Sequence, residues 1–417
     1  MPTNYKSADF SQLYRKFKKD AVIDDLTCLD SLVGLGEKYA FFQNLDEHIG
    51  FLERGCAVLN ERRNYLKVRQ AEITKLTGKI SLATGLEELV ELHRRLNVVA
   101  IELALRGIMV MEIHALITGY RHRLTEKVIA LVCEKLAPLP CEFTWFNMGS
   151  DGRREQTFFT DQDNAMVYEI DDSQEIDAYF ENFAREVVTS LDKVGFSLCT
   201  GNIMPTNPVW RGSLAGWSSK LEDIFYDQSQ ENLLRVIILM DIAYSAGSVS
   251  LSRCLIDKVH QMIRDNFGAL MVMAHSAVMS KVALTMFNNF RLEKSGDHRG
   301  MFNVKLFGWA PLIMTVRVFA LKYGFTDTNT VARIKHLEEQ HHFEVEFSQD
   351  LQKAYRVLTY AKMVSQVEAI VSRYEYDYFL DPGTLKDFEQ EDLKRALGSV
   401  EALQKLAYNS FFGGGVM

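Results

Sequence analysis

Several features that would assign the chain to a common class are missing from its sequence. Its six cysteines are scattered without a Cys-x-x-Cys pair, which is typical of reduced thiols in a cytoplasmic protein. The first ten residues contain no apolar segment, and the longest apolar runs are short or interrupted by charged residues. We therefore expect neither a signal peptide nor a membrane span. A net charge of −8 over 417 residues also argues against specific nucleic-acid binding.

The motifs of the common phosphoryl-transfer enzymes are missing too. There is no phosphate-binding loop of the form G-x-x-x-x-G-K-[ST], and there is no H-R-D and D-F-G pair of a protein kinase. The overall composition, with 47% hydrophobic and 24% charged residues, is that of an ordinary globular protein. Its length leaves room for two or three domains.

One stretch, Trp145 to Glu169, contains the residue types that phosphate and metal chemistry need. An apolar run ends at Gly149, as expected for a buried strand that stops at a turn. Glycine lets the backbone turn sharply there and approach a ligand closely, and the free amides of such a turn form an anion site. Ser150 and Arg153 follow at once, and the arginine could add a bidentate phosphate contact.

Two acids, Asp161 and Asp163, precede the apolar run Ala165 to Tyr168. If they belong to a strand, both side chains point to one face, because side chains alternate along a strand. The carboxylates are then about 6.6 Å apart along the backbone and can converge on one or two divalent ions. Each feature is commonplace alone, since an Asp-x-Asp is often a solvated turn. A phosphate turn followed by paired acids is far more specific.

The whole stretch resembles the DNA polymerase β-like nucleotidyltransferase superfamily, in which Gly-Ser is followed after about ten residues by Asp-x-Asp. Here ten residues separate Gly149-Ser150 from Asp161. More narrowly, GSDGRREQ and TDQDNA resemble the nucleotidyltransferases related to the amino-terminal domain of PII uridylyltransferase. That family is often fused to CBS or cyclic-nucleotide-binding modules, but we recognise no such module ahead of this stretch.

The resemblance implies a reaction in which Asp161 and Asp163 hold Mg²⁺ or Mn²⁺. It also implies a third catalytic and metal-binding carboxylate on a later strand, for which Asp241 is the best match. Relatives usually have an arginine two residues after this acid, whereas this chain has Ala243, and that departure weakens the match. A buried, unpaired aspartate is costly, so Asp241 needs a metal ion or another partner in either case.

Further matches lie downstream of the acids. The segment from Met204 to Leu214 follows the family pattern M-x-x-N-P-x-W-R-x-S-L. The match implies that four of its residues line the site, namely Asn207, Trp210, Arg211 and Ser213. Later segments resemble the family's substrate-binding-like helical domain, with Lys305, Arg317 and Arg333 reaching the triphosphate or acceptor unless they serve in surface salt bridges. The predicted phosphate-binding residues are Gly149, Ser150, Arg153, Arg211 and Lys305.

These observations predict an α+β protein that is mostly helical, with a small mixed sheet. We expect a helical N-terminal region at residues 1–137, a nucleotidyltransferase domain at 138–250 and a helical substrate-binding-like domain at 251–417. Apolar periodicity predicts a long helix from Leu86 to Ile117, ending at Gly119. A second helix should begin near Ser173 and end before Gly195.

We therefore predict a nucleotidyltransferase that moves a nucleoside monophosphate from a nucleoside triphosphate to a hydroxyl acceptor and releases pyrophosphate. By resemblance, the acceptor is a protein and the role is in signalling or regulation; a homodimer is left open. Two other classes compete with this prediction. One is a regulator that binds nucleotide without turnover, which Ala243 favours. The other is a structural interaction protein, which the helical N-terminal region favours.

Overall fold

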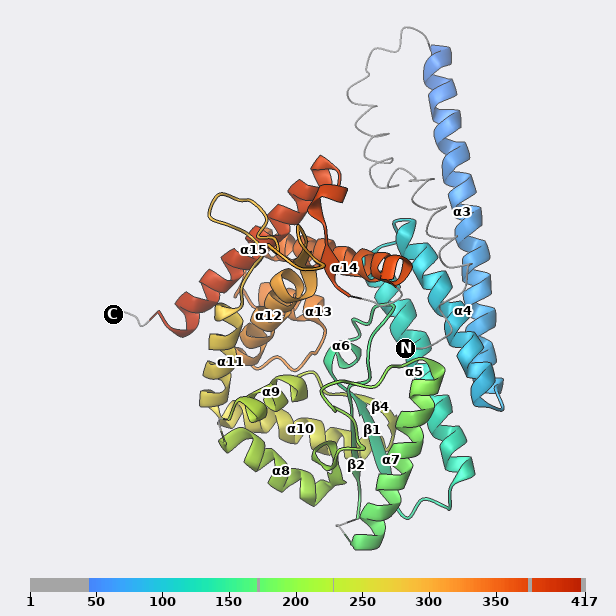
Figure 1. The fold of residues 1–417 in the computed structure, drawn as a ribbon, viewed down its shortest axis with the longest axis vertical. Coiled ribbons are helices and arrows are strands. Elements are labelled where there is room, and N and C mark those ends of the chain that lie inside the picture. The colour runs from blue at the N-terminus through green and yellow to red at the C-terminus, as the bar shows by residue number, and fades with distance from the viewer. Residues whose placement is uncertain (1–44, 171–172, 228, 374–376, 414–417) are drawn as a thin grey trace.

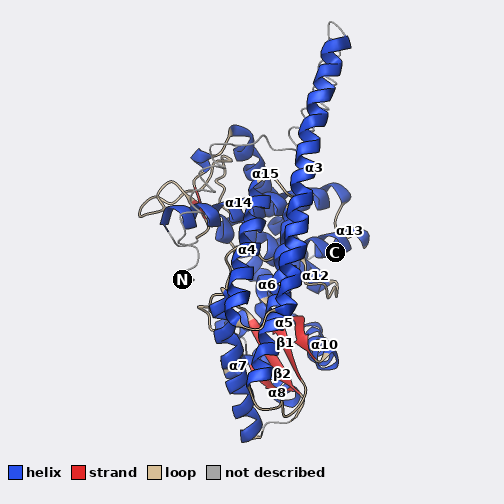
Figure 2. Ribbon diagram, turned by 90° about the vertical axis from the view of Figure 1, so that its right-hand side faces the viewer, coloured by secondary structure: helices blue, strands red, loops and turns tan. Residues whose placement is uncertain are grey.

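The computed structural model describes residues 45–170, 173–227, 229–373 and 377–413 (Figure 1). Its N-terminal part consists of the helices α3 (Leu45–Leu82), α4 (Leu86–Leu105) and α5 (Val110–Lys135). The first of these helices extends beyond the rest of the molecule, whereas the other two pack beside the sheet (Figures 1 and 2). None of the helices described here is long and apolar enough to cross a lipid bilayer.

The predicted apolar stripe of the first long helix is confirmed, but the predicted end of that helix is wrong. Its members are buried, namely Leu89, Leu92, Leu96, Val99 and Leu103. The helix ends at Leu105, and the chain turns at Gly107. The φ of Gly107 is +75°, a left-handed conformation that glycine adopts without strain. Gly119 lies inside α5, where a single glycine is tolerated because neighbouring turns are packed.

Four short strands form a mixed sheet in the order β3-β2-β1-β4. They are β1 (Phe143–Asn147), β2 (Asn164–Tyr168), β3 (Arg211–Ser213) and β4 (Ala243–Gly247). The first strand pairs antiparallel with both β2 and β4, while β3 runs parallel to β2. The predicted fold, mostly helical with a small mixed sheet, is confirmed.

Helices cover both faces of the sheet, which is why its central strands are buried throughout. On β2, Met166 and Tyr168 belong to one core cluster, whereas Ala165 and Val167 belong to the other. The helix α7 (Gln174–Val194) lies on the first side, and α8 (Leu214–Tyr226) and α10 (Val249–Asp265) lie on the second. The helix α7 has the predicted bounds, because the Ser173 hydroxyl caps its start and Gly195 ends it.

The rest of the described chain is a helical assembly with a two-stranded ribbon. Its helices are α9 (Gln230–Leu239), α11 (Phe267–Met279), α12 (Ala310–Lys322), α13 (Thr330–Glu339), α14 (Val345–Arg373) and α15 (Asp387–Phe411). The shorter elements are β5 (Phe302–Asn303), β6 (Phe379–Leu380), the π-helical turn η3 (Lys305–Trp309) and the 3₁₀ turns η2 (Pro208–Trp210) and η4 (Pro382–Thr384). The domain boundaries at 137/138 and 250/251 stay predictions.

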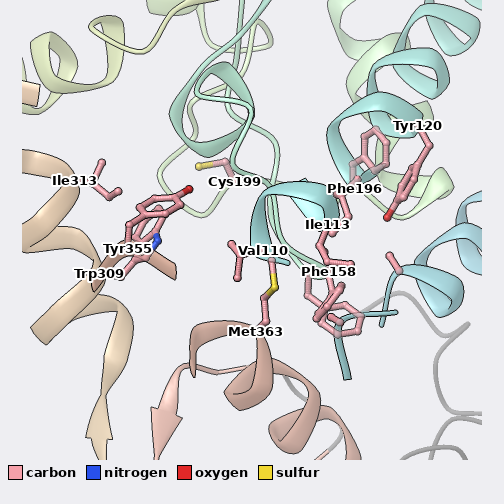
Figure 3. Packing of buried hydrophobic residues seen from close by; sticks show 14 of the residues in the cluster. Val110, Ile113, Tyr120, Phe158, Phe196, Cys199, Trp309, Ile313, Tyr355 and Met363 are labelled. Atoms are coloured by element: carbon pink, nitrogen blue, oxygen red, sulfur yellow. The ribbon is translucent and has the colours of Figure 1, made fainter. Parts of the chain in front are cut away.

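The loop that leads from β1 to β2 is held by hydrogen bonds from helices that precede it in the sequence and from one that follows it. The Asn97 side chain donates to the Phe158 carbonyl, and the Gln366 side chain of α14 donates to the carbonyl of Phe159. His114 contacts the carbonyl of Gln156, earlier in the loop, at 2.8 Å. Figure 3 shows Phe158 of this loop among other buried residues of the same hydrophobic cluster, including Ile113 and Met363. These contacts therefore fix the loop just ahead of the two acids, which lie at its end.

Close packing at Gly152 gives a test of this arrangement. A β-carbon there would lie 1.8 Å from the Asp241 carbonyl oxygen, so Gly152→Ala must displace backbone and should cost about 1–3 kcal/mol of unfolding free energy or more. Gly119→Ala is the matched control, because nothing lies within 4 Å and a helical alanine stabilises by about 0.5–1 kcal/mol. Urea unfolding would measure both. Equal stability of the two variants would contradict the packing.

Candidate active site

The glycine turn lies directly against the second acid. After β1, residues Gly149–Gly152 form the single helical turn α6, and Gly149 has a φ of +56°. A β-carbon at Gly149 would lie 2.4 Å from Oδ2 of Asp163. Glycine is thus required for two reasons, the left-handed backbone and the space that the carboxylate occupies.

The two acids lie just before β2 and not within it, which corrects the expectation that they form part of the strand. Asp161 makes an isolated bridge with Ser197, and the Asp163 carbonyl accepts the Met148 amide. Between them, the buried Gln162 side chain donates to the carbonyls of Val188 and Phe196. Because residues 161–163 are extended, the side chain of the middle residue, Gln162, points into the interior. One carboxylate oxygen of each acid and the Cys199 sulfur all lie within 4.8 Å of one another.

The Asp163 carboxyl is in an environment that disfavours its charge. Burial and the neighbouring Asp161 carboxylate raise the pKa of Asp163 to about 6. The Cys199 thiol, Lys305 and Arg153 act in the opposite direction but do not compensate. A divalent cation between the acids would remove the repulsion that raises this pKa.

The residues present fit a divalent metal ion. Oδ1 of Asp163 is buried and has no hydrogen-bond partner among the described residues, so a ligand atom is left over at the point where the acids converge. Two carboxylates suit Mg²⁺ or Mn²⁺, and the thiol beside them is a softer donor. Burial, together with Asp163 and Asp161, raises the pKa of Cys199 to about 12.

Cys199 was not identified from the sequence. It follows Asp163 by a whole helix, and its spacing resembles that of the other scattered thiols. The helix α7 and the turn after Gly195 return the chain to the acids, where Ser197 pairs with Asp161. The connection through α7 brings Cys199 to the acids, and a contact formed in this way leaves no pattern in the local sequence.

Asp241 is in a different position from the one expected of a third metal ligand. It lies just before β4, is buried, and pairs with Arg153 at 2.6 Å, with Arg333 at 3.1 Å and with Arg317. Although burial alone would raise its pKa, Arg317, Arg153 and Arg333 hold the pKa of Asp241 at about 2. Asp241 is not in the group formed by the acid pair and Cys199. We therefore retain only the acid pair as proposed metal ligands.

Residue 243, two residues after Asp241, is alanine, and the arginines that pair with Asp241 lie elsewhere in the sequence. Relatives are expected to carry an arginine there, close to the acid, but here three guanidinium groups reach Asp241 from other parts of the chain. Arg317 and Arg333 are therefore buried in a cluster and do not form the surface salt bridges that we considered. Both oxygens of the carboxylate are occupied without an arginine at residue 243.

Arg153 joins this cluster to the turn. Its Nε donates to Glu155 at 2.9 Å and its Nη1 donates to Asp241. Glu155 also accepts the Thr330 amide at 2.6 Å, and it therefore serves as a structural partner of Arg153 and of a backbone amide. The Arg153 guanidinium is thus already paired with two carboxylates, and its phosphate contact stays a prediction.

Five other predicted positions have defined surroundings, one in the glycine turn and four between residues 204 and 214. The Ser150 hydroxyl donates to the Gln156 side chain at 3.1 Å. Arg211 donates to Asp177 and to the Pro205 carbonyl, and its side chain is buried. The remaining candidates of that segment have structural roles, since Asn207 and Ser213 cap the starts of η2 and α8 and Trp210 is in the core.

Lys305 faces the acids from the helical C-terminal part. Its positive charge lowers the pKa of Asp163, and its Nζ lies 4.6 Å from the centre of the Tyr378 ring. The ribbon of β5 and β6 fixes this position, because the Val304 amide donates to the Tyr378 carbonyl at 2.9 Å. The structure thus brings together Gly149, Asp161, Asp163 and Lys305, while Asp241 and Arg153 form the adjacent charged cluster.

A glycine turn against paired acids beside a mixed sheet is the arrangement expected of the polymerase β-like nucleotidyltransferases. Two family models match the chain in agreement with this class. Residues 94–231 match the model described as Putative nucleotidyltransferase DUF294, and residues 268–411 match the Putative nucleotidyltransferase substrate binding domain. Together the matches span two thirds of the sequence, and the chain belongs to this family. No curated protein matches it.

The raised pKa of Asp163 predicts a pH-dependent loss of stability. Between pH 4 and 6 the folded protein keeps a proton that the unfolded chain has released, so wild-type stability should fall as the pH rises. Asp163→Asn removes this effect and should be more stable than wild type at pH 7, by up to about 3 kcal/mol, but not at pH 4. Urea unfolding with EDTA would measure it. Asp350→Asn, at an exposed site, should show no such trend.

Substitution of Asp241 distinguishes a structural role from metal binding. Asp241→Asn leaves three buried guanidinium groups without their shared counter-charge and should cost about 3–5 kcal/mol at neutral pH. Because Asp241 is apart from the acid pair, the loss should be the same in EDTA and in Mg²⁺. Thermal unfolding in both buffers would test this. A loss confined to Mg²⁺ would restore Asp241 as a metal ligand.

Proposed function

We propose that the protein is a metal-dependent nucleotidyltransferase that moves a nucleoside monophosphate from a nucleoside triphosphate to a hydroxyl group. The observation that carries the proposal is the position of Asp161 and Asp163, which converge against Gly149 and face Lys305. The acceptor that we favour is a protein hydroxyl, by likeness to PII uridylyltransferase, and the role is then regulatory. Transfer releases pyrophosphate.

The acids would hold the divalent ion, with the Cys199 thiol beside them. When bound, that ion supplies Lewis-acid polarisation of the phosphate under attack. The glycine turn lets the phosphate chain lie close to the backbone of Gly149 and Ser150, and Lys305 contributes positive charge from the opposite side. The acceptor oxygen bonds to the α-phosphorus, the bond from that phosphorus to the pyrophosphate oxygen breaks, and the hydroxyl proton passes to water.

A regulator that binds nucleotide without turnover is the second candidate. Two observations favour it, the alanine at residue 243 and the pairing of Arg153 with two buried carboxylates. An arginine held in this way has fewer free N–H groups for a triphosphate. The intact acid pair favours the enzyme, because a nucleotide-binding module without turnover has no need for two repelling carboxylates.

The reaction can be identified by the position of a label. The protein, Mg²⁺ or Mn²⁺ and a cell extract would be incubated with each nucleoside triphosphate labelled at either the α- or the γ-phosphate. We expect α-label to move to an acceptor, this chain included, and γ-label to leave as pyrophosphate. Asp161→Asn and Asp163→Asn should lose at least about 100-fold in transfer, since the proposed metal ligands are removed.

Asp350→Asn is a matched control for these variants, because Asp350 is exposed, pairs with Lys353 and is not one of the acids that converge. It should keep its transfer rate. Movement of γ-label to the acceptor would exclude the proposal, and tight nucleotide binding without any transfer would favour the regulator.

A further inference from the structure

Lys362 is a buried cation that the site described so far does not use. It lies on α14, with 1% of its side chain exposed. Its Nζ is 4.1 Å from the centre of the Trp309 ring and 5.7 Å from the centre of the Tyr378 ring. Trp309 ends the π-helical turn that Lys305 begins, and Lys305 also lies over Tyr378. Two lysines therefore converge on the same group of aromatic rings.

The Lys362 ammonium has no hydrogen bond or ion pair with any of the residues that the structure describes. An aromatic face attracts a cation, but it does not satisfy three N–H groups as oxygen atoms do. Burial lowers the pKa of Lys362 well below its ordinary value, and the positive charges of Lys305 and Arg153 lower it further. A lysine in these surroundings keeps its charge only when an anion lies close to it.

Nearby carboxylates do not supply that anion. Glu155 and Asp161 are the acids whose charge favours protonated Lys362. Glu155 is already bound by Arg153 and by the Thr330 amide, and Asp161 belongs to the acid pair. The Lys362 ammonium is therefore left able to bind an anion from outside the chain.

The position of Lys362 is well defined by its helix. Tyr355 and Thr359 precede it at helical spacing on the same face of α14. The Tyr355 hydroxyl contacts Nε2 of His114 at 3.1 Å, and Thr359 accepts the indole N–H of Trp309 at 3.1 Å. The helix is thus tied to α5 and to the turn that carries Lys305. A π-helical turn of this kind is frequent at functional sites.

We propose that Lys362 is a phosphate-binding residue that, together with Lys305, holds the β- and γ-phosphates of the triphosphate and the pyrophosphate formed from them. The identity of this ligand rests on the proposed function. In this arrangement the two parts of the chain bind different phosphates of the triphosphate. The acids before β2 face the phosphate that is attacked, and the lysines of the helical part face the leaving group, where negative charge accumulates during transfer.

Binding of inorganic pyrophosphate tests this role without any turnover. Titration calorimetry in Mg²⁺ would compare wild type with Lys362→Met, which keeps the length of the side chain and removes its charge. We expect about a 10- to 100-fold loss of pyrophosphate affinity, because bonds to a charged partner are lost. Affinity for a nucleoside monophosphate should change less than threefold, since it lacks the two outer phosphates.

Stability provides a second measurement. A phosphate-binding Lys362 and a purely structural Lys362 predict changes of opposite sign in the melting temperature of Lys362→Met. Without an anion, Lys362 must either carry an uncompensated charge or give up its proton, and both destabilise the free protein, so Lys362→Met should have an equal or higher melting temperature in the absence of ligand. A purely structural lysine would give a lower one. Lys353→Met is the matched control on the same helix, since Lys353 is exposed and pairs with Asp350. It should change neither pyrophosphate affinity nor stability.

The outcomes separate this inference from the proposed function. If Lys362→Met binds pyrophosphate as tightly as wild type does, Lys362 is not a phosphate-binding residue, even if α-label is transferred. If wild type does not bind pyrophosphate at all, the inference is excluded as well. If the affinity depends on Lys362 but no α-label moves, the phosphate site stands and the transferase proposal fails.

Discussion

One buried carboxylate connects the two matched parts of this chain. Asp241, just before the edge strand β4, is shared by Arg153 from the turn after β1 and by Arg317 and Arg333 from α12 and α13. Each charge would be costly in the interior without the others. The same turn is bound again by Thr328, whose hydroxyl donates to the Gly152 carbonyl at 2.8 Å. The position of the glycine turn against the acids therefore depends on the helical part.

Charge is distributed unevenly across the candidate site, and this asymmetry supports the proposed chemistry. On the sheet side, Asp161 and Asp163 repel each other and raise a pKa. On the helical side, Lys305 and Lys362 converge on the ring of Tyr378. A magnesium complex of a triphosphate carries charge of both signs and matches both sides. Either side alone is a poorly compensated cluster.

The sequence predicted the fold class and the local elements well, because these depend on short-range patterns. The apolar run before Gly149 placed β1, and the Ser173 and Gly195 signals delimited α7. The break near Gly107 was missed, since Gly107 and Gly119 lie in the same helical pattern and only the structure shows that Gly107 is left-handed whereas Gly119 is helical. Long-range geometry could not be predicted in this way.

The positions of Cys199, Asp241 and Lys362 illustrate that limit. Each is brought to its partners by a crossover or by packing between distant segments, and no spacing in the sequence encodes the result. Asp241 was recognised as an acid that needs a partner, but its partner could not be identified as arginine instead of metal. The resemblance to the family supplied the acid pair, and the structure supplied the environment of each acid.

The continuity of the larger core has a consequence for how substrates would enter and leave. Trp145 of β1, Val128 of α5 and Leu312 of α12 belong to one cluster of buried hydrophobic residues, so the sheet and the helices around it share a core. A hinge between the two parts would have to expose this cluster and the arginines at Asp241 together, at a large cost in free energy. Nucleotide exchange in such a molecule would proceed through side-chain and loop rearrangements near the acids, without separation of the two parts.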